Sequence, residues 1–428
     1  MQKFHVQNFG CRASQADGAA IESSLGHRGF EAVQDHKSAE FVILNTCTVT
    51  ATADDELRQI VRRVHRDNPD ARIVITGCYA QRAPEELVNL PGVSLVVGNS
   101  HKTKIAEMLA APYHGEVHVS DIFGSHEFLA TPVEEAAGDR SRPNLKIQDG
   151  CPNRCSFCII PFVRGHSRSA PLQQILDQVR DLSTRYPEVV LTGINLGRWG
   201  REPGLNMRLP DLLRTLLNET AIQRIRLSSV EPMDWSDDLL HLMAGSPRIA
   251  KHIHAPLQSG SDTVLRRMHR KYRPHHYESR IRLARELMPD AAIGADVMAG
   301  FPAESEAEFE QTRAFIERLP FTYLHIFPYS ERPGTPAAES SAQVPWPKRK
   351  ERGRILKSLG QKKNLEFRRS MIGRTLSAVT LGNAEAITSN YLAVELATAR
   401  PARQLTDLKI GTLTETALRE ENPLAVLR

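Results

Sequence analysis

The chain is poor in cysteine and has no long apolar run. It contains six cysteines in 428 residues. No basic-then-apolar segment opens it, and no apolar stretch approaches the roughly 20 residues that a membrane-spanning helix needs. We therefore expect a cytoplasmic protein without membrane contact. Disulfides are rare in that reducing compartment, so the cysteines are expected to bind metal or to act in catalysis. This length predicts two or three domains, each with its own core.

Half of the cysteines lie close together. Cys151, Cys155 and Cys158 form a C-x₃-C-x₂-C pattern, and three thiolates at this spacing can hold three irons of a cubane iron–sulfur cluster. Four cysteines are the usual ligands of such clusters, so three would leave one iron open to an exchangeable ligand. A structural zinc site would want a fourth ligand close by, and none follows this loop. The other alternative, three unrelated buried cysteines, does not explain the spacing.

The remaining three cysteines share a position in the predicted fold. Cys11, Cys47 and Cys78 each end a short apolar run and precede a segment of helical composition. Strands alternating with helices in this way predict a parallel sheet, and ligands bind such sheets beyond the carboxyl ends of the strands. We therefore predict that these cysteines converge on a second cluster. The alternative is that each is a small buried hydrophobic residue.

The pattern predicts an α/β protein with four parts. Residues 1–110 form a parallel βα sheet domain and 111–142 a linker. Residues 143–370 contain six strand–helix units, which predict a partial (β/α)₆ barrel with right-handed crossovers, and 371–428 form a small β domain. The predicted strands of the barrel are 144–149, 189–194, 224–230, 252–257, 292–298 and 323–329. The first of them ends directly before the cysteine loop, so that loop lies at the carboxyl face, where barrel active sites are built.

Positive charge is concentrated in one segment. The whole chain has a net charge of +5, yet residues 347–369 hold ten basic and two acidic residues. Such a run is most often a solvated helix face, but an asymmetry of this size also suits a polyanion such as RNA. The tail at 371–428 predicts either a small β-barrel of the oligonucleotide-binding type or a plain β appendage.

These features resemble the radical S-adenosylmethionine methylthiotransferases over almost the whole chain. The C-x₃-C-x₂-C loop is similar to the family's radical motif, and Cys11, Cys47 and Cys78 are similar to the ligands of its auxiliary cluster. The tail resembles the family's TRAM domain, a small RNA-binding β-barrel. Four segments look most like the branch that acts on threonylcarbamoyladenosine in tRNA, namely 158–169, 191–197, 256–261 and 327–330.

The resemblance implies two 4Fe-4S clusters and S-adenosylmethionine as cofactors. S-adenosylmethionine would bind the open iron of the radical cluster, and its reductive cleavage would give a 5′-deoxyadenosyl radical that removes hydrogen from C2 of adenosine 37. The auxiliary cluster would supply sulfur that a second S-adenosylmethionine has methylated. The implied partners are the tRNA anticodon loop, an electron donor such as flavodoxin or ferredoxin, and a sulfur source.

Further positions are candidates for contacts with S-adenosylmethionine. They lie in the cysteine loop or near the carboxyl ends of the predicted strands, where a cofactor at the barrel mouth would be bound. For each of them, a packing role is the alternative. The candidates are Phe157, Gly193, Asn195, Glu231, Gln258, Ser259, Gly260 and Asp296.

RNA binding is expected from the basic segment, from the tail and from an arginine near the cysteine loop. Contacts with phosphate would make this binding sensitive to salt. The predicted RNA-binding side chains are Arg164, Lys348, Arg349, Lys350, Arg352, Arg354 and Lys357.

Other functions stay open from the sequence. The same chemistry could act on isopentenyladenosine in tRNA or on an aspartate of a ribosomal protein. A protein of another class, a non-catalytic iron–sulfur sensor that binds RNA, also fits the motifs. Only an enzyme would release 5′-deoxyadenosine from S-adenosylmethionine under anaerobic reduction, so that release separates the two classes.

Overall fold

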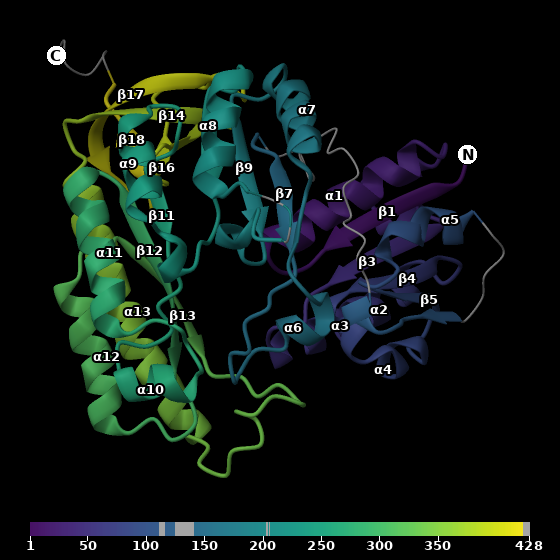
Figure 1. Cartoon of the computed structure of the whole chain (residues 1–428). Helices are drawn as coiled ribbons and strands as arrows, with labels where there is room; N and C mark the ends of the chain where they lie inside the picture. Colours follow the sequence, from purple (N-terminus) through teal and green to yellow (C-terminus); the bar gives the residue numbers. More distant parts are fainter. Residues whose placement is uncertain (111–115, 125–140, 203, 205, 423–428) are drawn as a thin grey trace.

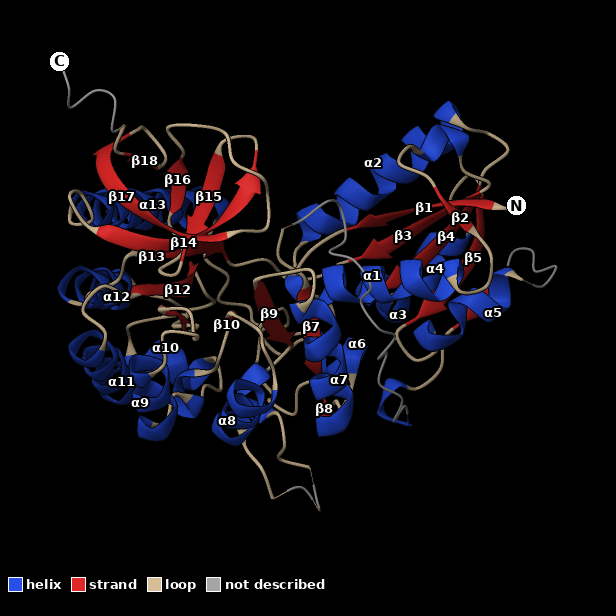
Figure 2. Ribbon diagram, turned by 90° about the horizontal axis from the view of Figure 1, so that it is seen from above, coloured by secondary structure: helices blue, strands red, loops and turns tan. Residues whose placement is uncertain are grey.

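The computed structural model describes residues 1–110, 116–124, 141–202, 204 and 206–422. The predicted α/β class is confirmed: a parallel N-terminal sheet, central strands and a closed C-terminal β-barrel follow one another along the chain. Figures 1 and 2 show the N-terminal sheet at one end of the row of central strands and the barrel at the other end. Most of the predicted linker lies outside the described residues. Within the described residues, no helix combines the length and the apolar composition needed to cross a membrane.

The N-terminal region is a six-stranded sheet in the order β2-β1-β3-β4-β5-β6, and all neighbouring strands are parallel. Its strands are β1 (Lys3–Asn8), β2 (Glu31–Ala32), β3 (Phe41–Thr46), β4 (Arg72–Gly77), β5 (Val93–Gly98) and β6 (Glu116–His118). Its helices are α1 (Arg12–Gly26), α2 (Ala51–Asp67), α3 (Cys78–Arg82), α4 (Pro84–Val88) and α5 (Ile105–Leu109), with 3-10 turns η1 (His36–Ser38), η2 (Lys102–Lys104) and η3 (Ile122–Gly124). Every residue of β3 is buried, as expected for a parallel strand covered on both faces.

Three neighbouring strands of this sheet lead into the loops that carry cysteines. Asn8 of β1 pairs with Asn45 of β3, and Thr46 of β3 pairs with Gly77 of β4. The three strands therefore end at one edge of the sheet. Cysteines that are far apart in sequence follow them at that edge, as predicted: Cys11, Cys47 and Cys78.

The central region consists of two groups of strands. One holds β10, β9 and β7 with a short antiparallel β8, and the other holds β11, β12 and β13. A parallel bridge from Ile225 to Ile249 joins the two groups. The strands are β7 (Asn144–Asp149), β8 (Arg168–Ser169), β9 (Glu188–Gly193), β10 (Arg224–Leu227), β11 (His252–His254), β12 (Ala292–Ala299) and β13 (Tyr323–Pro328). The helices and turns are α6 (Ile160–Arg164), α7 (Leu172–Ser183), η4 (Leu196–Arg198), α8 (Leu209–Glu219), η5 (Pro232–Asp234), α9 (Asp237–Gly245), α10 (Asp262–Arg267), α11 (Pro274–Leu287) and α12 (Glu306–Arg318).

All six predicted central strands are present, and helices cover their outer side (Figure 2). Apolar side chains from strands and helices, such as Leu191, Leu213 and Ile293, pack in one continuous core. β10 and β11 end three residues earlier than predicted, at Leu227 and His254. The polar residues beyond these points belong to loops at the carboxyl ends, where they surround a potential site.

The C-terminal region is a closed five-stranded barrel in the order β14-β15-β16-β18-β17. This finding favours the barrel over the plain β appendage. The long helix α13 (Trp346–Arg369) leads into β14 (Thr375–Gly382), β15 (Glu385–Thr388), β16 (Ala393–Glu395), β17 (Leu405–Leu413) and β18 (Leu418–Glu420). The turn after β15 is held against the central strands, because the Arg226 guanidinium donates to the carbonyls of Thr388 at 2.9 Å and Ser389 at 3.0 Å.

Candidate active site

Cys11, Cys47 and Cys78 form the N-terminal cysteine site. Cys47 and Cys78 are buried, and Cys11 is exposed. Gly10 passes so close that a β-carbon on it would lie 2.9 Å from Cys47 Sγ, and its φ of +93° also favours glycine. Burial, together with the neighbouring thiols of Cys78 and Cys11, raises the pKa of Cys47 to about 12. Metal binding at this site must therefore release thiol protons.

Two side chains donate N–H groups to Cys78. Arg164 Nε lies 3.3 Å from Cys78 Sγ, and Asn99 Nδ2 lies 3.7 Å from it. Arg164 is 1% exposed and also donates to Asp149 at 3.0 Å and to Asp17 at 3.1 Å. We therefore assign Arg164 to this site and not to RNA, because its guanidinium is buried and already committed to sulfur and carboxylate partners.

The central cysteine site consists of Cys151, Cys155 and Cys158. It occupies the loop between β7 and α6. Arg270 Nη1 donates to Cys155 Sγ at 3.3 Å, and Asn195 Nδ2 donates to Cys151 Sγ at 3.7 Å. Arg270 also forms an ion pair with Glu231, whose pKa is raised by burial. A cavity of about 270 Å³ beside Cys155 is lined by Asn195, Glu231 and Arg270.

Both cysteine sites suit an iron–sulfur cluster better than a single zinc ion. In the described residues, the three sulfurs of neither site lie within 4.8 Å of one another as a set. Sulfurs around one zinc would lie about 3.8 Å apart, from Zn–S bonds of about 2.3 Å. A cluster of several irons spans a wider set, and the arginine and asparagine N–H groups at each site match the negative charge of its thiolates.

A larger cavity, of about 700 Å³, lies between the N-terminal cysteine site and the central strands. Cys11 and Cys47 line it from the N-terminal sheet, and Gly193 and Asp296 line it from β9 and β12. Tyr391, from the turn after β15, lines it as well. All three regions of the chain thus contribute to one cavity, and its volume is in the range that holds a nucleoside-sized ligand.

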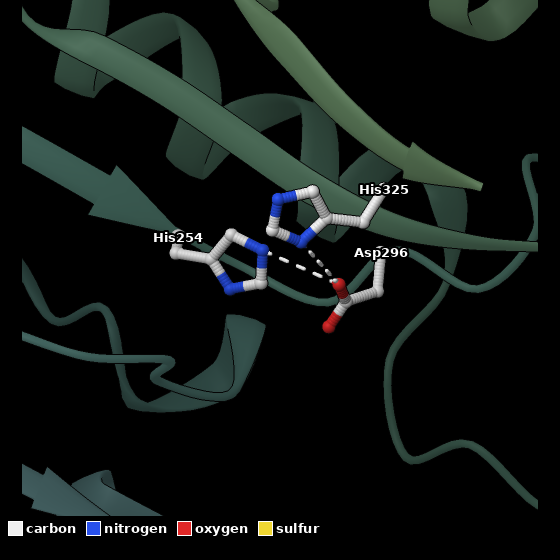
Figure 3. A group of neighbouring side chains, drawn as sticks. All are labelled: His254, Asp296 and His325. Atoms are coloured by element: carbon white, nitrogen blue, oxygen red, sulfur yellow. Dashed lines mark ion pairs between the residues drawn. The ribbon is translucent and has the colours of Figure 1, made fainter. Parts of the chain in front are cut away.

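One wall of this cavity is formed by His254, Asp296 and His325 (Figure 3). Asp296 Oδ1 lies 3.4 Å from His254 Nε2 and 3.3 Å from His325 Nδ1, and Ser229 Oγ lies 2.7 Å from His254 Nδ1. Burial would raise the pKa of Asp296, but hydrogen bonds from the two histidines outweigh it and hold that pKa well below its usual range. The three ligand atoms are close enough to hold a divalent metal ion. The ion pairs already account for their arrangement without one.

Next to this wall lies an aromatic surface. The rings of His252 and Tyr391 are stacked with centroids 4.4 Å apart, and His252 Nε2 lies 2.7 Å from Tyr323 Oη. Burial, followed by the charge of Arg226, lowers the pKa of His252 well below its usual value. His252 is therefore neutral near pH 7, and this surface is suited to stacking with a nucleobase.

Comparisons with known proteins agree with this arrangement. The model of the uncharacterized protein family UPF0004 matches residues 3–98, and the radical SAM superfamily model matches residues 145–316. A threonylcarbamoyladenosine tRNA methylthiotransferase from Aquifex aeolicus is 40% identical over 92% of this chain and 96% of its own length. The chain belongs to the radical S-adenosylmethionine methylthiotransferase family. A tRNA-2-methylthio-N(6)-dimethylallyladenosine synthase from Pelotomaculum thermopropionicum is 30% identical over 90% of this chain and 88% of its own length.

This methylthiotransferase is thus a transferase whose family implies a 4Fe-4S cluster and S-adenosylmethionine. A solved structure also matches, that of the radical S-adenosylmethionine methyltransferase TsrM from Kitasatospora setae. Its TM-score is 0.57 over 79% of this chain and 77% of TsrM. At 16% identity, this likeness shows the fold alone.

The residues predicted to contact S-adenosylmethionine lie in different places in the methylthiotransferase. Asn195 and Glu231 line the cavity beside Cys155, whereas Gly193 and Asp296 line the larger cavity. Phe157 packs edge-on against Phe301, and Gln258 has a left-handed backbone with φ of +63°. Ser259 and Gly260 face α12, where the hydroxyl of Ser259 and the N–H of Gly260 contact Thr312 Oγ1 at 3.0 and 3.1 Å. We therefore keep Asn195 and Glu231 as the S-adenosylmethionine candidates.

The predicted RNA-binding residues of α13 also separate. Arg349 and Arg352 are buried: Arg349 donates to the carbonyls of Val344 and Tyr329, and Arg352 pairs with Glu304 at 2.9 Å. Their guanidiniums hold the helix on the central region and are not free for phosphate. Lys348 is half-buried in ion pairs with Glu306 and Glu351. The exposed members are Lys350, Arg354 and Lys357.

The sequence analysis did not identify several residues of the site. Arg270 lies in a basic run that resembles any solvated segment, and His325 lies in an ordinary strand. Arg12 and Tyr391 are separated by most of the chain, and only the docking of the C-terminal barrel brings them together. For Arg12, its position directly after a predicted cluster cysteine was a usable signal.

Proposed function

We propose that this chain adds a methylthio group to C2 of threonylcarbamoyladenosine at position 37 of tRNA and consumes two S-adenosylmethionine molecules per product. The observation that carries this proposal is the cavity of about 700 Å³ lined both by Cys11 and Cys47 and by the central strands. A nucleoside there would contact the N-terminal cysteine site and the carboxyl ends of the central strands. The choice of nucleoside follows the 40% identical relative that bears its name.

In this proposal both cysteine sites hold a 4Fe-4S cluster. When bound, these clusters and S-adenosylmethionine supply the reductive cleavage, the removal of hydrogen from C2 and the transferred sulfur. The chain itself supplies ligands, orientation and shielding. Arg270 neutralises charge at Cys155, and the partly buried Glu231 carboxylate beside it lies where it can accept hydrogen bonds from the amino group of S-adenosylmethionine.

The larger cavity orients the target base. Tyr323 and Tyr391, whose rings pack on the buried ring of His252, line the cavity and offer aromatic side chains on which adenine can stack. Walls from three regions of the chain keep bulk water from a reactive intermediate. A base in the anticodon loop is already unpaired, so placing it in the cavity requires no duplex opening.

The remaining parts of the proposal concern partners. The exposed side chains of Lys350, Arg354 and Lys357 and the C-terminal barrel contact tRNA phosphates. An electron donor such as flavodoxin or ferredoxin reduces the central cluster, and a separate sulfur source renews the N-terminal one. The reaction takes place in the cytoplasm, where tRNA is modified.

Mass spectrometry of nucleosides from total tRNA, in cells with and without the gene, tests the proposal. We expect 2-methylthio-threonylcarbamoyladenosine to disappear and its unthiolated precursor to accumulate. Disappearance of methylthio-isopentenyladenosine instead would keep the chemistry and replace the substrate. If neither nucleoside changes, a ribosomal-protein aspartate as substrate or a non-enzymatic RNA-binding sensor replaces the proposal.

A further inference from the structure

Arg12 occupies a corner where two cavities meet. It is the first residue of α1 and directly follows Cys11. It lines the cavity of about 700 Å³ and also a second one, of about 480 Å³, which Arg142 and Tyr391 line with it. The Arg12 side chain is therefore one residue away from the sulfur site and faces the space in which the target nucleoside is proposed to lie.

The guanidinium of Arg12 has no acidic partner among the described residues. Its Nη2 donates to Tyr391 Oη at 2.8 Å, and its Cζ lies 5.7 Å from the centre of the Tyr391 ring. A tyrosine hydroxyl neutralises no charge. A partly buried cation without a counter-ion among the described residues favours binding of an anion.

The surroundings of Arg12 add further positive charge. Arg142, Arg224 and Arg226 all pair with one carboxylate, that of Glu188, at 3.3, 3.5 and 2.7 Å. Burial would raise the pKa of Glu188, but these arginines lower it to about 2, so this carboxylate is fully ionised. Arg12 adds a further guanidinium beside Arg142 in the lining of the smaller cavity. Among the described residues, that lining contains no carboxylate and is electropositive, whereas Glu56 and Asp296 line the larger cavity.

Tyr391 is held in an unusual conformation that fixes this arrangement. Its φ is +62°, in the left-handed region that non-glycine residues rarely adopt. Its amide donates to the Thr388 carbonyl at 3.0 Å, and its ring stacks on His252. Conformations of this kind persist where the surrounding structure imposes them, and they concentrate at ligand sites. Here the result is that a residue of the C-terminal barrel orients Arg12.

We propose that Arg12, oriented by Tyr391, binds the carboxylate at the end of the N6 side chain of the target nucleoside and thereby selects an anionic side chain over an apolar one. This inference rests on the proposed function and identifies the side chain that recognises the substrate. A guanidinium and a carboxylate form two parallel hydrogen bonds. An apolar side chain would leave the Arg12 charge desolvated and unpaired, which is the situation in which sites discriminate most strongly.

Binding of anticodon stem-loop RNA by the full-length, cluster-reconstituted protein tests this inference. Two RNAs are compared, one with threonylcarbamoyladenosine at position 37 and one in which its carboxylate is converted to the uncharged amide. We expect the wild-type protein to bind the carboxylate RNA about 10- to 100-fold more tightly than the amide RNA. Arg12→Gln should bind both RNAs equally, and Arg12→Lys should regain part of the preference.

Two more variants control the experiment. Tyr391→Phe keeps the ring and removes the hydroxyl, so we expect a smaller loss of preference than in Arg12→Gln. Arg63→Gln replaces an exposed arginine on α2 and should leave the wild-type preference unchanged. Thermal unfolding of each variant identifies any that fail to fold, and Arg12→Lys then carries the test.

The other outcomes overturn the inference in distinguishable ways. If Arg12→Gln lowers the affinity for both RNAs by the same factor, Arg12 binds a backbone phosphate and not the nucleoside carboxylate. If Arg12→Gln keeps the wild-type preference, another group reads the carboxylate. If the wild-type protein binds the two RNAs equally and prefers a stem-loop with isopentenyladenosine, the proposed function fails together with the inference.

Discussion

The N-terminal and central cysteine sites are built in opposite ways but carry similar groups. Three separate βα loops of a parallel sheet supply the first, whereas one loop after β7 supplies the second. Each has an arginine donor 3.3 Å from one sulfur and an asparagine donor 3.7 Å from a sulfur. The two sites share N–H donors to sulfur because both are expected to hold the same kind of cofactor. They differ in the loops that carry their cysteines because they belong to different folds.

The two arginines differ in their surroundings. Arg164 is enclosed between the N-terminal sheet and the central region, where it pairs with Asp17 and Asp149. Arg270 pairs with Glu231 at the wall of an open cavity. The N-terminal site therefore depends on the junction between two regions of the chain, and the central site depends on groups that also face a ligand.

Removal of one cysteine from each site should have the largest effect on activity. It should separate the release of 5′-deoxyadenosine from the transfer of the methylthio group. We expect Cys155→Ala to abolish release of 5′-deoxyadenosine, because the central site loses a ligand. Cys47→Ala should abolish methylthio transfer while 5′-deoxyadenosine release stays measurable. Each variant should contain about half of the wild-type iron. Iron analysis and product chromatography after anaerobic reconstitution measure these quantities.

One result would contradict the separate roles of the two cysteine sites. If Cys47→Ala keeps the iron of the central site and yet releases no 5′-deoxyadenosine, the N-terminal site takes part in the cleavage itself. Ser279→Ala, on the exposed surface of α11, is a control because it leaves all six cysteines and their hydrogen-bond donors in place.

Replacement of the two arginines should affect the stability of the chain unequally. Arg164→Gln removes one cation from two buried carboxylates, of which Asp17 keeps Lys102 and both keep Lys146, and we expect the free energy of unfolding to fall by about 1–3 kcal/mol. Arg270→Gln leaves one carboxylate, which retains 22% exposure of its side chain, so we expect a smaller loss. Urea unfolding of the metal-free proteins measures both. Equal losses would contradict the enclosed position of Arg164.

The sequence predicted the fold and the cysteine pattern well because both depend on local regularities. Apolar runs between helical segments identified all six central strands, and Cys11, Cys47 and Cys78 were predicted to meet because each follows such a run. The ends of β10 and β11 were predicted three residues too late, because Ser228 and Ser229 of the first belong to a loop that lines the cavity and Pro256 of the second has no N–H for strand pairing.

The basic segment contains a helical pattern that the sequence analysis did not use. Arg349, Arg352 and Leu356 are spaced three and four residues apart, and together they form the buried face of α13. Counting charge alone treated all ten basic residues as one surface. The helical period would have separated Arg349 and Arg352 from the exposed Lys350, Arg354 and Lys357.

Contacts between distant segments could not be predicted in this way. Arg12 meets Tyr391, and Arg164 meets Cys78, only because separate regions of the chain pack against each other. A single sequence has no pattern that records such pairs. The left-handed backbone of Tyr391 likewise depends on the turn and on its docking, so it becomes visible only in the structure.

The two asparagines provide the most sensitive comparison of the sites and the smallest expected effect. Removal of an N–H donor from a ligand sulfur destabilises the reduced cluster and lowers its reduction potential. We expect Asn195→Ala to lower the potential at the central site alone and Asn99→Ala to lower it at the N-terminal site alone. Each shift should be smaller than that caused by replacing the arginine of the same site, because a neutral donor at 3.7 Å stabilises added negative charge less than a cation at 3.3 Å.

Redox titration with electron paramagnetic resonance detection can follow each site separately if the Cys47→Ala and Cys155→Ala proteins are used as backgrounds. Asn99 Nδ2 also donates to the Val163 carbonyl at 2.7 Å, so Asn99→Ala should in addition lower the unfolding temperature slightly. The backbone N–H of Asn195 donates to Gln148 Oε1 at 2.7 Å, and alanine keeps that bond. Asn89→Ala, on the exposed surface, should change neither potential. A shift of both potentials by one asparagine variant would mean that the two sites are electrostatically coupled, and Arg164, which donates to Cys78 and pairs with Asp149 at the end of β7, would be the group through which they are coupled.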